Sequence, residues 1–265
     1  MEEVAEDADR KPLRGSHALW RPFYFESDET QIRLITQQRR VIMNRKTMLY
    51  TQIIAFLISL IISLPALAGD TNSDLVDAAK EGDTATMEAL LAKGAGVNTK
   101  DEDFGKTLIH WAVENRHYVM AKLLIAQGAN VNAKDEVNGW TPLHQAAQRG
   151  DKDMVKLLIA QGANVNAKDE VSGWTPLHFA ALWNLEDMVK LLIAQGADVN
   201  AKSSFNITPL HVVSEGGDKD MVQLLVSNGA DVSSKDEFGE TALACAERCG
   251  HIEIAQFLKG AGAKE

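Results

Sequence analysis

A short motif ending in histidine recurs at a nearly constant interval along this chain. The motif is Thr-Pro-Leu-His, or Thr-Leu-Ile-His in its first copy, and its histidines are 34, 34 and 33 residues apart: His110, His144, His178 and His211. A glycine keeps the same interval of 33 or 34 residues, at Gly94, Gly128, Gly162, Gly196, Gly229 and Gly262. Self-similarity at such a period is the signature of stacked repeats. We therefore expect six units, starting near residues 73, 107, 141, 175, 208 and 241.

Each unit has the pattern of two short helices followed by a loop, which the third unit shows in full. Thr141 suits the cap before a helix, and Pro142 suits the first helical position, where its missing N–H costs nothing. Gly150 would end this helix. A Met-Val-Lys-Leu-Leu stripe then predicts a second helix that stops at Gly162, and the Asn-, Asp- and Gly-rich residues 164–173 predict a turn or short hairpin.

A helix pair of this size cannot bury its apolar stripe alone, so each unit must pack on its neighbours and the array grows as a solenoid. The recurring TPLHxAAxxG and GAxVNAKD segments resemble the ankyrin repeat over residues 73–265, roughly three quarters of the chain. The resemblance implies an all-α solenoid of about six helix-pair units, with projecting β-turn or hairpin loops and a concave face for protein partners. Three loops carry an extra residue and are expected to differ in geometry: Asp101 to Gly105, Asp135 to Gly139, and Asp169 to Gly173.

The repeated histidines do not have the spacing of a metal site. Packed helices sit about 8 to 10 Å apart, whereas ligands that share one zinc ion lie about 2.0 to 2.1 Å from it. Histidines of successive units are therefore too far apart to hold one ion. The resemblance implies instead that each histidine hydrogen-bonds the backbone between the loop and the helix, which makes it a structural residue.

No other pattern in the sequence predicts catalysis or a cofactor site. The segment Phe104 to Thr107 resembles the end of a phosphate-binding loop, but Lys100 stands where the first glycine of that loop should be. Cys245 and Cys249 have a C-x3-C spacing without a second pair of cysteines, so they do not predict a metal site. We predict two free thiols, with Cys245 buried and Cys249 more accessible. We expect neither enzyme activity nor a cofactor.

The charge of the repeats argues against a nucleic-acid partner. From Asp70 onward the chain has 18 Lys and Arg residues against 29 Asp and Glu residues, a net charge of −11. Phosphate backbones attract basic surfaces, whereas an acidic surface favours solubility and basic partners. The composition is 45% hydrophobic but only 6% aromatic, which suits helices that pack through small residues. We expect one elongated, monomeric domain over residues 70–265.

Residues 43–68 have the order of a secretory signal peptide. Two basic residues precede an apolar centre over residues 53–64, and an Ala-Leu-Ala segment ends at Ala68. We therefore expect cleavage after Ala68 and a mature chain that starts at Gly69. The alternative is a retained membrane anchor, because residues 48–68 are nearly long enough to span a bilayer. In either case the basic residues keep the N-terminal side in the cytoplasm, and the repeats are exported.

Residues 1–42 precede that segment and show no sustained hydrophobic periodicity. Since Met43 stands where a signal peptide would begin, the simplest interpretation of this N-terminal extension is a start assigned too far upstream. A disordered cytoplasmic tail is the alternative. Eukaryotic ankyrin proteins mostly work in the cytosol or nucleus, so an exported array resembles a bacterial protein. We expect a periplasmic or secreted location, or, if the anchor is retained, the inner membrane with the repeats outside the cytoplasm.

The resemblance also implies which positions face a partner: the residue before each Thr-Pro-Leu-His-like motif and two residues at the end of each first helix. We call these positions the groove face; they are Lys106, Glu114, Asn115, Trp140, Gln148, Arg149, Trp174, Leu182, Trp183, Ile207, Glu215, Gly216, Glu240, Arg248 and Cys249. An apolar centre with a charged rim is typical of a protein interface. The candidates for partner contact are Trp140, Trp174, Leu182, Trp183, Ile207, Gln148, Arg149 and Glu215. Trp140 and Trp174 have the alternative role of packing loop on loop, which makes Trp183 the better candidate.

Together these patterns favour a non-catalytic module that binds a partner protein outside the cytoplasm and regulates or protects it. A membrane-tethered scaffold and an effector secreted from the cell are the alternatives. They differ in whether residues 48–68 are kept and in where the protein accumulates. The sequence does not name the partner, because the fold provides a surface and not an identity.

Overall fold

The computed structural model describes residues 71–264. A helical segment over residues 71–81 is followed in this part by eleven helices: α2 (Thr84–Ala92), α3 (Leu108–Glu114), α4 (Tyr118–Ala126), α5 (Pro142–Gln148), α6 (Lys152–Ala160), α7 (Pro176–Leu182), α8 (Glu186–Ala194), α9 (Pro209–Gly216), α10 (Lys219–Ser227), α11 (Ala242–Arg248) and α12 (Ile252–Gly260). Isolated antiparallel bridges join Lys100 to Thr107 and Lys235 to Thr241. The predicted all-α fold class is confirmed.

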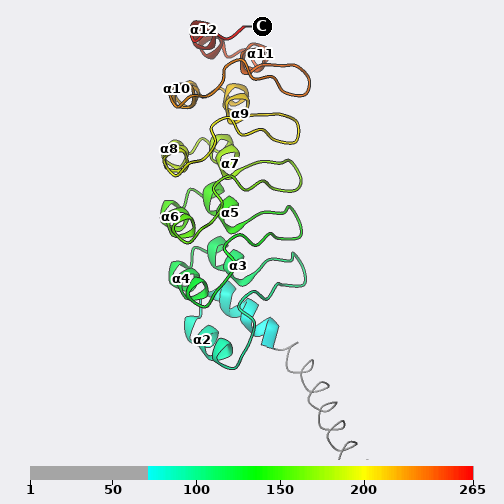
Figure 1. Cartoon of the computed structure of the whole chain (residues 1–265), viewed down its shortest axis with the longest axis vertical. Coiled ribbons are helices and arrows are strands. Elements are labelled where there is room, and N and C mark those ends of the chain that lie inside the picture. Colours follow the sequence, from blue (N-terminus) through cyan, green and yellow to red (C-terminus); the bar gives the residue numbers. More distant parts are fainter. Residues whose placement is uncertain (1–70, 265) are drawn as a thin grey trace, which may run out of the picture. The chain divides into compact units, whose positions relative to one another are not determined.

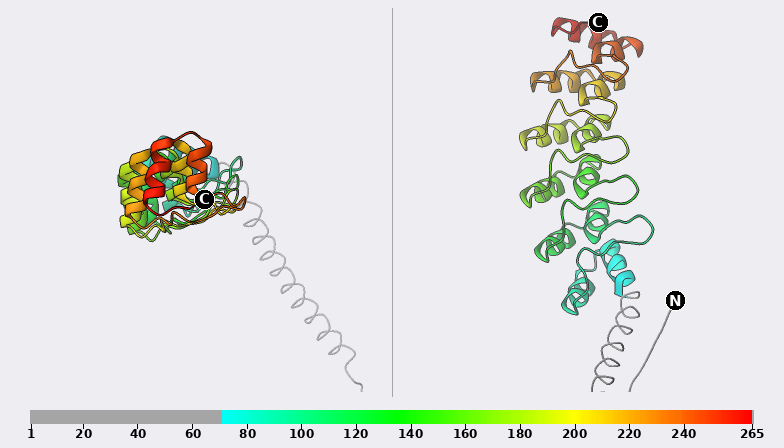
Figure 2. Two further views of the ribbon diagram at one scale, coloured as in Figure 1. Left: turned by 90° about the horizontal axis from the view of Figure 1, so that it is seen from above. Right: turned by 45° about the vertical axis from the view of Figure 1, so that its right-hand side comes forward.

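The helices of residues 71–264 form two rows, and the loops project from them as a third layer (Figure 1). The first helices of the units, α3, α5, α7, α9 and α11, lie between the loops and the row of second helices. Consecutive first helices pack on one another, and each also packs on the second helix of its own unit. A view turned about the vertical axis shows the same stacking of unit on unit (Figure 2). The repeats therefore build a solenoid.

Each first helix after the first unit begins at a threonine, which in four units works together with a histidine three residues later. In the third unit the backbone N–H of Thr141 donates to Nδ1 of His144 over 3.1 Å, and the Thr141 hydroxyl lies 2.9 Å from the same nitrogen. Pro142 follows at the first helical position, where its fixed φ suits a helix. The helix ends at Gln148, and Gly150 then turns the chain with a φ of 69°. These local features agree with the sequence prediction for this unit.

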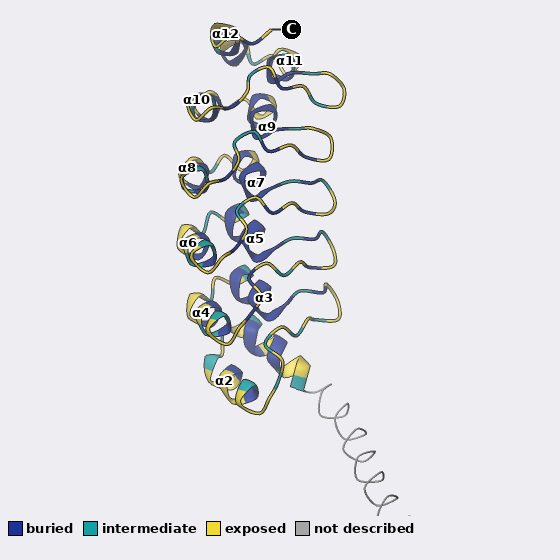
Figure 3. Cartoon of the chain, in the orientation of Figure 1, coloured by how far each residue is buried: buried dark blue, intermediate teal, exposed yellow. Residues whose placement is uncertain are grey.

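The core is a continuous strip of apolar side chains that runs through all the described units. In the third unit Leu143, Ala146, Met154, Val155 and Leu158 are fully buried, and the equivalent residues of the other units repeat the pattern (Figure 3). Alanines in the first helices let neighbouring units approach closely. Because the buried side chains are closely packed, truncating one of these leucines to alanine should cost about 2 to 5 kcal/mol.

The first unit has a buried side and a polar side. Leu75, Ala79 and Met87 are fully buried against the rest of the array. Asp74 and Asp77 of the same unit are exposed. This arrangement is the one expected of a terminal unit that covers the apolar face of its neighbour.

The loops are closed by an acidic side chain at their base and are joined to one another at their tips. In the loop that precedes α5, Oδ1 of Asp135 accepts hydrogen bonds from the N–H groups of Asn138 and Trp140, at 2.9 and 3.2 Å. The N–H of Glu136 then donates to the carbonyl of Phe104 in the preceding loop over 3.0 Å. Gly139 has a φ of 68°, and a Cβ there would lie 2.4 Å from the side chain of Glu170. This position therefore requires glycine.

The extra residue in three of the loops is accommodated by this same acidic closure. Asp101 and Asp169 accept two backbone N–H groups each, at the same offsets as Asp135. In the shorter loop that precedes α9, Ser203 takes the place of the aspartate, and its hydroxyl accepts the N–H groups of Phe205 and Ile207 at 3.2 and 3.0 Å. In the other shorter loop Asp236 accepts the N–H groups of Phe238 and Glu240, also two and four residues later. The longer loops are closed over three and five residues instead, and both kinds share the bond to the next loop.

Several predictions concern residues outside the described part of the chain. They are the N-terminal extension over residues 1–42, the signal peptide over residues 43–68, the alternative anchor over residues 48–68, and the cleavage after Ala68. All of them stay predictions. Within residues 71–264, none of the helices is both long enough and apolar enough to cross a bilayer.

Candidate partner-binding face

The four repeated histidines connect consecutive units from within the protein. His144 is fully buried; its Nδ1 accepts from Thr141, and its Nε2 lies 3.1 Å from the carbonyl oxygen of Trp174, at the end of the loop that leads into the next unit. The same Nε2 contact, to the residue just before the following unit, measures 3.0, 3.0 and 3.2 Å at the other three: His110, His178 and His211. The predicted structural role, bonding the backbone between loop and helix, is confirmed.

These histidines are held in their neutral form. Burial lowers the pKa of His144 and of His178 to about 4, and it lowers the pKa of His110 and His211 as well. In the part of the chain that the structure describes, no group of three or more His, Cys, Asp and Glu side chains could hold a metal ion. The histidines therefore act as fixed hydrogen-bonding groups at neutral pH.

The two cysteines differ in environment as predicted. Cys245 is buried in α11, and burial raises the pKa of its thiol to about 11. Cys249 is exposed at the end of the same helix, and both thiols are free in this structure. Since a thiolate is the reactive form of cysteine, Cys245 is inert at neutral pH.

Trp140 and Trp174 form an aromatic cluster with the first helix of the fourth unit. Phe179 of α7 lies between them, with ring centroids 4.7 Å from Trp140 and 5.3 Å from Trp174 in edge-to-face geometry. Each indole also stacks on the histidine four residues after it, His144 or His178. Both tryptophans are half-buried. The contacts support a packing role, but the partner is Phe179 rather than the neighbouring loop.

Leu182 and Trp183 are the large apolar residues that the groove face leaves in water. Their exposed fractions are 50% and 56%. Leu182 is the last residue of α7. Trp183, which the sequence predicts at the end of that helix, is its C-terminal cap, one residue beyond the helix. The next residue, Asn184, has a φ of 54°, and the chain turns there from α7 towards α8.

The charged residues of the groove face are paired across units on both sides of Leu182 and Trp183. Glu114 lies 2.6 Å from Nζ of Lys106 and 3.5 Å from the guanidinium of Arg149. At the other end, the guanidinium of Arg248 lies 3.5 Å from Glu215 and 3.3 Å from Glu240. The fourth unit supplies no charged residue to this face. Its apolar pair is therefore flanked by ion pairs.

The remaining candidates are divided between the surface and the loop bases. Ile207 is half-buried, and its carbonyl accepts from His178, so its backbone is part of the unit-to-unit connection. Gln148 is half-buried beside Gln145, a residue that is not among the predicted partner contacts. The available signal was that residue 145 occupies the same motif position as Trp111 and Phe179. Because Gln145 is smaller than the Trp111 and Phe179 rings of the neighbouring units, its position predicts unfilled space on the groove face.

These two rows of helices, joined by the repeated Thr and His pair and carrying projecting loops, define a helical repeat protein. The chain matches a family model described as "Ankyrin repeats (3 copies)" over residues 75–169, 134–203 and 201–264. It belongs to the ankyrin repeat family. It is also similar to a curated protein, the palmitoyltransferase akr1 of Neurospora crassa, with 36% identity over 61 residues. That match covers 23% of this chain and 8% of the relative.

Membership of this family gives a coarse function. Ankyrin repeats are protein–protein interaction modules that are typically non-catalytic, and they indicate a protein partner for this chain. The match to the palmitoyltransferase spans less than a tenth of that protein's length, so the enzyme's activity is not carried over.

Proposed function

We propose that this protein is an exported, non-catalytic module that binds a partner protein through the groove face and regulates or protects it. The observation that carries the proposal is the exposed pair Leu182 and Trp183, placed between ion pairs that are satisfied within the protein. An apolar pair that stays in water loses the stabilisation that burial would give it. A partner that covers it would supply that burial.

The arrangement of charges favours a partner that is apolar at its centre of contact. Glu114 and Arg149 neutralise one another on one side, and Arg248 and Glu215 do so on the other. Such exposed pairs contribute little free energy by themselves. They exclude like charges from the edge of the interface and form a polar rim, while the indole at the centre supplies most of the affinity.

The proposal places the protein outside the cytoplasm, in the bacterial periplasm or the medium. It rests on the order of basic, apolar and Ala-Leu-Ala segments within residues 43–68. Intact mass of the protein isolated from its native host tests it, with a mature chain starting at Gly69 expected. A native species that still contains residues 48–68 would instead make it a membrane-tethered scaffold. Fractions of periplasm and culture medium then separate a resident protein from a secreted effector.

The partner is proposed to be a protein and not a nucleic acid, and the module is proposed to act as a monomer. The net charge of −11 from Asp70 onward repels a phosphate backbone. A membrane enters the proposal only if residues 48–68 are retained.

Site-specific photo-crosslinking in the native host tests the interaction. A benzophenone amino acid at position 183 should give a discrete adduct with one partner protein. The matched control is position 194, because Ala194 is exposed at the far end of α8 in the same unit, about 12 Å along that helix from its start. An adduct at 183 and none at 194 supports the proposal. Equal adducts at both positions, or no adduct at 183, would contradict it.

A further inference from the structure

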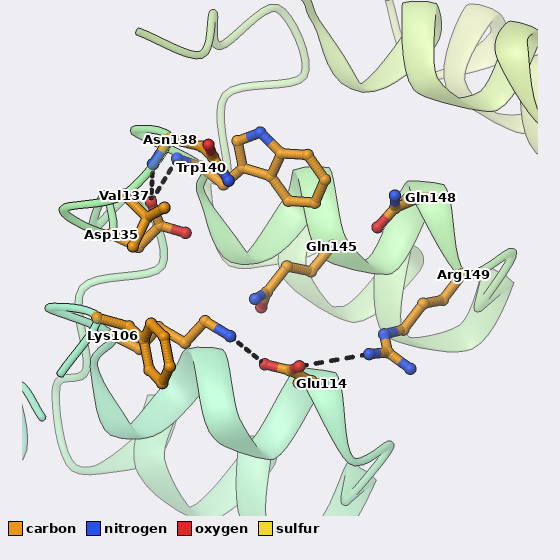
Figure 4. A pocket seen from close by; sticks show the side chains of 10 residues that line it. Lys106, Glu114, Asp135, Val137, Asn138, Trp140, Gln145, Gln148 and Arg149 are labelled. Atoms are coloured by element: carbon orange, nitrogen blue, oxygen red, sulfur yellow. Dashed lines mark hydrogen bonds and ion pairs between the residues drawn. The ribbon is translucent and has the colours of Figure 1, made fainter. Parts of the chain in front are cut away.

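A cavity opens on the groove face where one unit lacks a ring that its neighbours have. The residue directly after the motif's histidine is Trp111 in the second unit and Phe179 in the fourth, but it is Gln145 in the third. A cavity of about 160 Å³ lies at this place, lined by Phe104, Lys106, Glu114, Asp135, Val137, Asn138, Trp140, Gln145, Gln148 and Arg149 (Figure 4). In other proteins a cavity of about 150 Å³ holds one benzene ring. The space therefore has the volume of a single aromatic side chain.

Gln145 brings an unsatisfied polar atom to this cavity. The residue is only 5% exposed, and its buried Oε1 atom has no hydrogen-bond partner among residues 71–264. Its side chain points into the space between Trp140 and Glu114 (Figure 4). Leaving a buried acceptor unpaired costs about 1 to 3 kcal/mol. A guest that donates one hydrogen bond at this point would remove that cost.

The charges around the cavity favour a neutral guest. Glu114 is bound by both Lys106 and Arg149, and the carboxylate of Asp135 accepts two backbone N–H groups of its own loop. A cationic guest would meet Lys106 and Arg149, and an anionic guest would meet Glu114 and Asp135. Neither would find a free counter-charge, so both would bear a cost of desolvation without full compensation.

We propose that this cavity receives a tyrosine side chain of the partner protein. The ring would fill the missing volume beside Trp140. Oε1 of Gln145 is buried in this structure, so the Gln145 side chain would rotate on binding to accept from the hydroxyl group. Phenylalanine would fill the space but leave that acceptor unpaired. This inference rests on the proposed function, since it assigns a second contact on the same face as Leu182 and Trp183.

The test uses the side-chain analogue p-cresol as a probe of the full-length protein. In nitrogen-15 NMR spectra, p-cresol should shift the side-chain amide signal of Gln145 and the indole signal of Trp140 in a saturable way. Toluene lacks the hydroxyl group and should bind about three- to tenfold more weakly, because one ordinary hydrogen bond contributes about that factor to the affinity. Absence of a saturable p-cresol shift, or toluene binding as tightly as p-cresol, would overturn the proposal and leave a water-filled cavity.

Two substitutions separate volume from hydrogen bonding. Gln145→Phe introduces the residue that the fourth unit carries at this position, fills the cavity, and should abolish the Trp140 shift while raising the melting temperature. Gln145→Met keeps the side-chain length and removes the acceptor, so p-cresol and toluene should bind equally. Undiminished p-cresol binding by Gln145→Phe, or a preference for p-cresol that persists in Gln145→Met, would sink the proposal. If these tests fail while the adduct at position 183 persists, the tyrosine site is wrong and the proposed function stands.

Discussion

The Nε2 nitrogen of His144 lies 3.1 Å from the carbonyl oxygen of Trp174, which ends the loop leading into the next unit. Because Nδ1 of the same ring accepts the backbone N–H of Thr141, the ring carries its proton on Nε2 and donates it to that carbonyl. A protonated imidazole has two donors and no acceptor. Protonation would therefore break the cap at Thr141, so the stack of units depends on neutral histidines.

The first prediction follows from the titration of these rings. Burial lowers the pKa of His144 and His178 to about 4, below the value of about 6.5 for histidine in an unfolded chain. Between these values the unfolded state binds more protons, so stability is complete above about pH 6.5 and is lost as the pH falls towards 4. Urea unfolding at a series of pH values should show this loss, with a slope of up to about 1.4 kcal/mol per pH unit for each histidine.

The matched variant for this prediction is His144→Gln, which does not titrate in that range. It should be less stable at pH 7, because the cap at Thr141 is weakened, but its stability should fall less steeply between pH 6.5 and 4.5. The carboxylates whose pKa is lowered, such as Asp83 and Asp231, lose their contribution only at lower pH. An unchanged pH slope in the variant would show that His144 does not carry the effect.

The second prediction concerns the first unit as a cap. A chain that starts at residue 95 lacks Leu75, Ala79 and Met87, which are fully buried in the intact array. Removing them should expose the apolar side of the second unit, lower the melting temperature and promote aggregation. Light scattering and thermal unfolding measure both effects. A truncated protein as soluble and as stable as the parent would show that this unit is not a cap.

The third prediction is the state of the cysteines. A thiol reagent at pH 8 should label Cys249 quickly and Cys245 slowly, because Cys245 is buried and its thiol pKa is raised to about 11. Unfolding without a reducing agent should then release a second reactive thiol. A bridge between residues four apart would close too short a loop to add much stability. Finding no free thiol after unfolding would contradict the prediction.

The repeat architecture could be predicted because each unit carries its own local signals. Thr141 and Pro142 start a helix and Gly150 ends it through contacts within a few residues, which a sequence displays directly. The same threonine, proline and glycine signals predict where each unit begins. The export signal and the residues before it lie outside the described part of the chain, and they stay predictions.

The details of the groove face could not be predicted because they depend on contacts between units. Phe179 meets Trp140 across roughly one repeat, and the spacing alone does not say which way an indole turns. The cavity beside Gln145 exists only because large rings occupy its neighbours in the stack. Trp183 is a cap and not a helical residue, a difference of one position that lies within the usual uncertainty of helix ends.

The central claim is that Trp183 binds a partner and does not hold the fold together. Once the partner is captured, its affinity and the melting temperature should be measured for Trp183→Ala and Leu158→Ala. Trp183→Ala should weaken binding by about 2 kcal/mol or more, roughly thirtyfold in Kd, with a nearly unchanged melting temperature. Leu158 is fully buried, and its truncation should cost about 2 to 5 kcal/mol of stability. A large drop in melting temperature for Trp183→Ala with unchanged affinity would contradict the account.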